Sequence, residues 1–110
     1  MHEGHRDRMR QQLRQSGMDS LSDVQVIEVL LYHAFARQDT NLLAHALLKR
    51  FGSLAGVFEA PVAELMKVPG IGQSAAELIA LVPQIERRHL ISRTRTESIL
   101  TSTAQCGQYL

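Results

Sequence analysis

The segment of residues 65–79 constrains the fold most, because a proline and two glycines separate two helical patterns of apolar residues. Pro69 cannot donate a hydrogen bond inside a helix and keeps its preceding residue extended, so a first helix should end just before it. Gly70 and Gly72 permit positive φ and leave no side chain over the backbone, while Ile71 between them can pack back between the helices. The segment therefore predicts a helix-hairpin-helix motif.

The start of the second helix of this motif is expected to bind an anion. Its first backbone N–H groups have no partner within the helix and point outward, which suits a nucleic-acid phosphate. The small Ala75 would let the two helices cross closely. The predicted phosphate-binding residues are Lys67, Gly70, Ile71, Gly72, Gln73 and Ser74. The alternative is that the Pro-Gly-x-Gly sequence is only a structural turn.

The composition favours a small helical protein. A chain of 110 residues allows one small domain and a tail, and with 45% hydrophobic but only 5% aromatic residues its core must be aliphatic. The single cysteine excludes an internal disulfide and suits a reducing compartment. A polar N-terminus without a long apolar run predicts neither a signal peptide nor a membrane span, and hence a cytoplasmic protein. We expect no cofactor and no metal, since His2 and His5 lack a third ligand nearby.

The most basic stretch lies near the N-terminus, in a helix expected over residues 4–15. Arg6, Arg10 and Arg14 recur every four positions and so line one face of that helix. This row of arginines is a candidate second basic face for a nucleic-acid backbone. A solvated surface helix without a ligand explains the same pattern equally well.

Capping residues divide the middle of the chain into further helices. Ser22, followed three residues later by a glutamine, predicts the start of a helix over residues 23–34. Asp39 or Thr40 can cap a third helix, which Gly52 should end. Ser53 is the next N-cap candidate, and residues 54–58 would form a connector. The last helix should run over residues 73–89, with an interior proline at position 83 that kinks or breaks it.

These elements predict an all-α fold: a compact bundle of five to six short helices with two helix-hairpin-helix units. The second unit covers residues 61–82, and the first is degenerate because it lacks the Gly-x-Gly hairpin. The two units would pack about a pseudo-twofold axis and share a core. Residues 1–91 form this domain, and residues 92–110, which lack a sustained helical period, form a linker or the start of a further domain.

Several segments together resemble the N-terminal region of the RadC family, bacterial proteins labelled as DNA repair factors. The matching segments are Gly4-His5-Arg6-Asp7-Arg8-Met9-Arg10, Leu21-Ser22-Asp23, Ile27-Glu28-Val29-Leu30-Leu31, Phe51-Gly52-Ser53-Leu54 and Val68-Pro69-Gly70-Ile71-Gly72. The resemblance implies two helix-hairpin-helix units followed by a metal-dependent JAB1/MPN domain, whose zinc motif this sequence lacks. The chain therefore looks like an N-terminal fragment, and no hydrolase residue carries over to it.

The leading functional hypothesis is a non-catalytic module that binds DNA weakly and without sequence preference. Lys67 is the only cation beside the hairpin, and Gln73 and Ser74 stand where many DNA-binding hairpins carry Lys or Arg. Few phosphate contacts mean low affinity. The alternative is a protein-interaction module that dimerises or positions the missing JAB1/MPN domain. An enzyme is not expected, because the residues supply no nucleophile, base or metal set.

Overall fold

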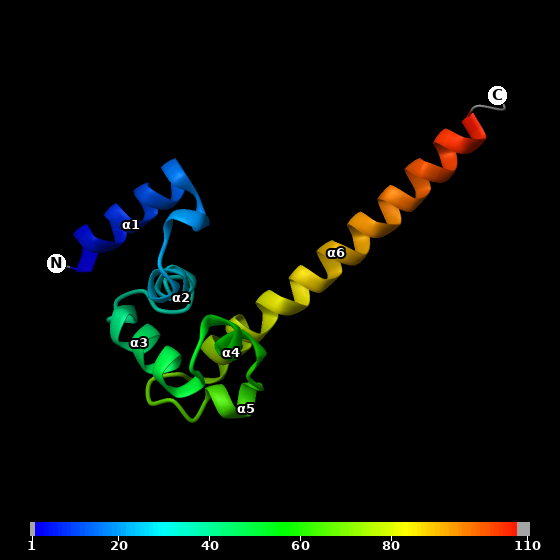
Figure 1. Cartoon of the computed structure of the whole chain (residues 1–110). Helices are drawn as coiled ribbons and strands as arrows, with labels where there is room; N and C mark the ends of the chain where they lie inside the picture. The colour runs from blue at the N-terminus through cyan, green and yellow to red at the C-terminus, as the bar shows by residue number, and fades with distance from the viewer. Residues whose placement is uncertain (1, 108–110) are drawn as a thin grey trace. The chain divides into compact units, whose positions relative to one another are not determined.

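The computed structural model describes residues 2–107 of the chain, and the side chains of residues 4–100. Within that range the chain is helical and contains no strand, which confirms the all-α prediction (Figure 1). The elements are α1 (His2–Ser16), the 3-10 helix η1 (Met18–Ser20), α2 (Asp23–Leu31), α3 (Thr40–Phe51), α4 (Leu54–Glu59), α5 (Val62–Leu65) and α6 (Gln73–Gly107).

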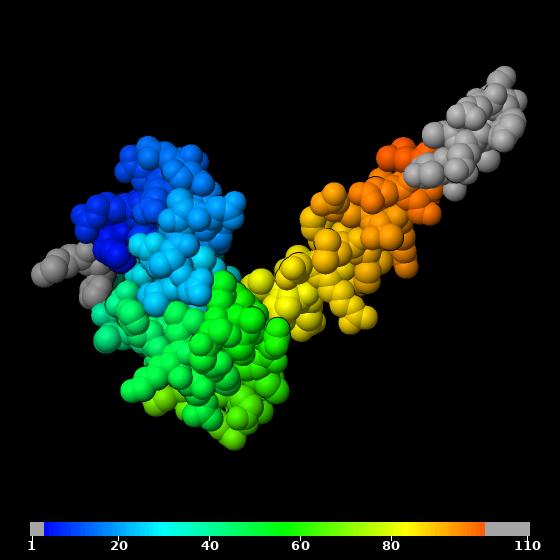
Figure 2. Space-filling model, in the orientation of Figure 1, coloured from blue at the N-terminus to red at the C-terminus, as the bar shows by residue number. Residues whose placement is uncertain are grey.

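The chain divides into two compact units, Met1–Ala80 and Leu81–Leu110. The first unit contains α1 to α5 and the first eight residues of α6. The second unit is the remainder of α6, in which every side chain from residue 84 to residue 100 is exposed (Figure 2). The division falls earlier than residue 91, and the role of residues 92–110 as a linker stays a prediction.

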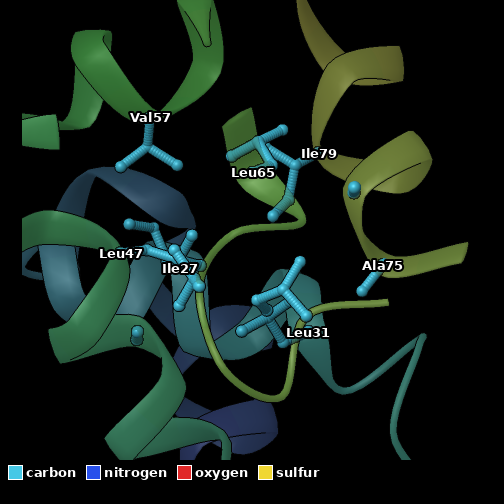
Figure 3. Packing of buried hydrophobic residues seen from close by; sticks show 11 residues of the cluster. Ile27, Leu31, Leu47, Val57, Leu65, Ala75 and Ile79 are labelled. Carbon is cyan, nitrogen blue, oxygen red and sulfur yellow. The ribbon is translucent and has the colours of Figure 1, made fainter. Parts of the chain in front are cut away.

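The main core of the first unit is aliphatic, as the composition predicts. α2, α3, α4, α5 and the start of α6 each contribute side chains with no exposed surface (Figure 3). These fully buried residues are Ile27, Leu31, Ala44, Leu47, Val57, Leu65, Ala76 and Ile79. Burying each large aliphatic side chain contributes about 1.5–3 kcal/mol, so this shared core is what holds the short helices in place. The two helix-hairpin-helix units and the pseudo-twofold relation between them stay predictions.

A smaller cluster attaches α1 to α2. Met9 of α1 packs against Val29 and Tyr32, and all three are buried. Leu13 and Leu21 are partly buried against them. The narrow apolar stripe of α1 therefore packs this helix against α2 within the first unit.

The predicted caps are confirmed. The Ser22 side chain accepts from Gln25 N–H and the Gln25 side chain accepts from Ser22 N–H, which completes a capping box. Asp39 accepts from the first amides of α3, and Gly52 ends that helix in the left-handed region with a φ of 86°. Ser53 caps the next helix by accepting from the amide of residue 56.

Three boundaries differ from the predictions. α2 ends at Leu31 rather than at residue 34, because the amides of His33 and Ala34 donate three residues back, to the carbonyls of Leu30 and Leu31, and the chain turns there. The expected connector after Ser53 is itself a helix, α4, since the serine cap lets even six residues close a turn. α6 continues past Pro83, because one missing N–H removes a single rung and leaves the flanking turns intact.

The polar residues after Ser92 also differ from expectation. Residues 92–107 are helical, although they carry no sustained apolar period. Ion pairs and local bonds along one helix explain part of this: Arg93 lies 3.5 Å from Glu97, and Thr94 donates to the carbonyl of Leu90. No helix in the described part of the chain is both long and apolar enough to cross a membrane.

Candidate nucleic-acid interface

The hairpin between α5 and α6 is built from the residues that the sequence predicts. Just after α5, the amides of Lys67 and Val68 donate to the carbonyls of Glu64 and Leu65, three residues back, so the chain tightens before the turn. Ile71 N–H then donates to the carbonyl of Val68 across Pro69 and Gly70. Gly70 has a φ of 93°, so proline followed by a positive-φ glycine gives the pattern of a type II turn.

Two features hold this turn on the first unit. Val68 and Ile71 are 2% and 4% exposed and belong to the main core, so the apolar residue between the glycines does pack inward. A Cβ on Gly70 would lie 2.7 Å from Cδ2 of Leu43, a side chain of α3. Glycine is thus required at position 70 both by its positive φ and by the close approach of α3. At position 72 neither a positive φ nor a nearby atom requires glycine.

The start of α6 leaves backbone donors open to solvent. Gln73 and Ser74 are exposed, and their N–H groups have no hydrogen-bond acceptor within the described part of the chain. The first intrahelical bond comes from Ala76 N–H to the carbonyl of Gly72. Since Gly72 has no side chain to cap the helix, these donors and the helix dipole form a site of positive potential.

The charged side chains of α5 and the hairpin are paired with one another. Lys67 Nζ lies 2.7 Å from Glu64 Oε2, and Arg50 lies 3.8 Å from the other carboxylate oxygen. The hydrogen bond and charge of Lys67 hold the pKa of Glu64 below its ordinary value. Gln73 Nε2 donates to Glu77 one turn further along α6. The one cation that the sequence places at the hairpin is therefore already paired.

The predicted basic face on α1 needs a correction at Arg6. This residue is only 9% exposed, and its guanidinium donates to the carbonyls of Phe35, Ala36 and Gln38 at 2.8–3.0 Å. Its plane also lies over the Tyr32 ring, 4.6 Å from the centroid. Arg6 therefore satisfies the backbone between α2 and α3, and its burial keeps it from serving as part of an exposed basic face.

The other two arginines of the row remain accessible. Arg10 and Arg14 are exposed, and neither forms an ion pair among the described side chains. Arg10 lies 5.6 Å from the Tyr32 centroid, and Arg14 Nε donates to the carbonyl of Arg10. Of the predicted basic face, these two residues can still contact a polyanion.

Comparison with known families identifies the family to which this chain belongs. A family model described as UPF0758 N-terminal matches residues 3–77. The chain belongs to the UPF0758 N-terminal family. This family is the N-terminal region of RadC-family proteins, so the resemblance given by the sequence is confirmed. The match covers α1 through the first turn of α6, and no solved structure matches the chain.

One polar cluster in the UPF0758 N-terminal region escaped the sequence analysis. Glu28 of α2 is 2% exposed and accepts from His5 of α1 at 2.6 Å. Tyr32 and Asn41 each lie 3.4 Å from one of its oxygens. Burial and the Glu28 charge raise the pKa of Tyr32 to about 12. The sequence feature that could have revealed this cluster is a glutamate inside an otherwise apolar run, because a buried charge needs polar partners.

Proposed function

We propose that this UPF0758 N-terminal region is a non-catalytic module that binds the DNA backbone without sequence preference. The observation that carries the proposal is the pair of exposed, unbonded N–H groups of Gln73 and Ser74, fixed by the buried Ile71. Backbone donors at a helix start suit a phosphate oxygen and carry no base information. Arg10 and Arg14 supply a second set of donors on α1.

Charge balance sets the expected strength of this binding. Lys67 is paired with Glu64, Glu77 lies one turn into α6, and the formal net charge of the whole chain is only +1. Counterion release supplies most of the affinity of non-specific binding, and the one lysine beside the hairpin is already paired. The affinity should therefore fall in the range of about 10⁻⁴ to 10⁻⁶ M and weaken steeply with salt.

A fluorescence anisotropy titration with duplex DNA tests the proposal. The variant S74E places a carboxylate at the start of α6, where it suits the helix dipole but repels a phosphate. We expect wild type to bind at low salt and S74E to bind roughly fivefold or more weakly, since like charges at close range cost about 1 kcal/mol or more. The matched variant S92E adds the same charge to the exposed part of α6 and should change affinity little.

Two results would reject the DNA-binding proposal. The first is no anisotropy change with wild type at low salt. The second is an equal loss of affinity in S74E and S92E, because a loss that depends only on total charge does not point to the hairpin. Circular dichroism should show both variants as helical as wild type.

A second candidate function is protein interaction or dimerisation, and the second unit favours it. Six large hydrophobic side chains in this part of α6 are 36–64% exposed: Leu81, Ile85, Leu90, Ile91, Ile99 and Leu100. Exposed apolar surface of this kind often marks a partner-binding site. A monomeric mass by light scattering, unchanged on adding an isolated JAB1/MPN domain of a RadC-like protein, would count against it.

A further inference from the structure

Glu64 of α5 lies between two cations from different parts of the first unit. Its Oε2 is 2.7 Å from Lys67 Nζ at the end of the hairpin's first helix, and its Oε1 is 3.8 Å from Arg50 in the last turn of α3. All three side chains are substantially exposed, at 41%, 59% and 42%. The carboxylate thus joins the hairpin to a basic residue that sequence spacing alone does not place beside it.

The three charges make a compact group with a net charge of +1. The Glu64 carboxylate is ionised near neutral pH, and Lys67 holds its pKa below the ordinary value, so it competes with any other anion for both cations. Exposed ion pairs of this kind contribute little stability, because water screens them and their long side chains must be ordered. An incoming phosphate can therefore replace the carboxylate as the partner of either cation at small cost.

The geometry also keeps Arg50 available to a ligand. Its guanidinium lies 5.7 Å from the Phe51 ring centroid, which supports the side chain on the surface of α3. Its contact with Glu64 at 3.8 Å is long for a charge-assisted hydrogen bond. The planar guanidinium can instead offer two parallel donors to a phosphodiester, a geometry that arginine matches better than lysine.

We propose that Arg50 and Lys67 form a second contact for the DNA backbone beside the hairpin, and that Glu64 weakens this contact by competing for both cations. This proposal rests on the proposed function, because it extends the same surface toward α3. It assigns to Arg50 a direct phosphate contact and to Glu64 the role of a positioning residue that also limits affinity. The ligand is the phosphodiester backbone of a duplex, which offers repeated phosphates to donors at more than one place on a protein surface.

The variant E64Q tests the competition directly. We expect E64Q to bind duplex DNA about two- to fivefold more tightly than wild type at low salt, the scale of one exposed ion pair. Its affinity should also depend more steeply on salt, with a slope that grows by up to about 0.9, the value for one added phosphate contact. The control D19N removes a carboxylate from η1 that is exposed and forms no ion pair among the described side chains. It should leave the slope unchanged.

A double-variant cycle assigns the gain to Arg50. R50Q should weaken binding about twofold or more alone, and R50Q/E64Q should lose most of the gain that E64Q shows. Equal affinities of E64Q and wild type, or equal gains from E64Q and D19N, would overturn the proposal. Circular dichroism must show that each variant keeps its helices. If E64Q does not fold, the loss of affinity in R50Q still tests the contact of Arg50 with DNA.

The same titration separates this inference from the DNA-binding proposal. If wild type binds DNA and both E64Q and R50Q bind with the same affinity as wild type, the DNA-binding proposal stands and the present inference is rejected. Absence of binding by wild type and by E64Q removes both. A final arm adds inorganic phosphate to the E64Q–DNA complex at constant ionic strength. The proposal expects displacement only at phosphate concentrations far above that of the duplex phosphates; displacement at a lower phosphate concentration would assign the site to free phosphate and overturn the assignment to DNA.

Discussion

The Nε2 atom of His5 in α1 lies 2.6 Å from the buried Oε2 of Glu28 in α2, 23 residues further along the chain. This pair forms the polar part of the attachment of α1, beside the apolar contacts of Met9. The other partners of Glu28 are at 3.4 Å, which is long for a strong hydrogen bond. The buried carboxylate therefore depends mainly on one histidine.

Replacing His5 by alanine should destabilise the first unit. H5A leaves the Glu28 carboxylate buried with only its weaker partners, and an unsatisfied buried acceptor costs about 1–3 kcal/mol. The free energy of unfolding from a urea titration followed by circular dichroism measures the effect. H45A serves as the control, because His45 is exposed on α3; equal effects of H5A and H45A would contradict the importance of the pair.

Replacing Arg6 by alanine should lower the free energy of unfolding more than replacing its neighbour Arg8. R6A removes donors from three carbonyls between α2 and α3 and also the contact with the Tyr32 ring, so we expect a loss of about 2–4 kcal/mol. Arg8 is exposed, and R8A should stay within about 0.5 kcal/mol of wild type. Urea midpoints of the two variants give the comparison. An undiminished stability of R6A would show that solvent can replace the guanidinium at these carbonyls.

The two glycines of the hairpin should respond differently to alanine. G70A forces a side chain onto a backbone with φ of 93° and places its Cβ against Leu43, so we expect a loss of about 1–2 kcal/mol. Most of this cost comes from the backbone, since the Leu43 methyl can move. G72A meets open space at ordinary φ and should be close to neutral. Thermal unfolding of both variants tests the difference, which a neutral G70A would refute.

The raised pKa of Tyr32 predicts that the folded protein loses stability at high pH. Its folded-state pKa is about 12 against an ordinary value of 10.0, because burial and Glu28 disfavour the phenolate. The neutral form is thus favoured by folding, so its contribution is complete below pH 10.0 and is lost as pH rises toward 12. The stability of wild type should fall in that window by up to about 1.4 kcal/mol per pH unit more steeply than that of Y32F. Parallel urea titrations across the window measure both slopes, and equal slopes would contradict the assignment.

Local chemistry predicted much of the fold. Ser22, Asp39, Gly52 and the proline–glycine turn each act on backbone groups within a few residues, so short-range sequence patterns are enough to locate them. The same patterns located the proline–glycine turn between α5 and α6 and the start of α6 at Gln73. Whether these residues bind DNA stays a prediction.

Long-range contacts account for what the sequence did not predict. Helical spacing put Arg6 on one face with Arg10 and Arg14, but it could not show that one end of that face meets the turn after α2. Glu28 stands in an apolar run, and its partners come from α1 and α3, at separations of 23 and 13 residues. Arg50 likewise reaches the hairpin only through Glu64, a contact that depends on how α3 and α5 pack.

Pro83 has a consequence for how the ends of α6 open. The carbonyl of Ile79, which is buried in the core, would normally accept from the amide of residue 83, and proline has none. A helix frays by losing successive backbone hydrogen bonds. A missing hydrogen bond therefore reduces the cooperativity between the parts of α6 before and after Pro83. Amide deuterium uptake should therefore be rapid in the exposed residues beyond Pro83 and slow in the turn that carries Ala76 and Ile79, even though both belong to one continuous helix.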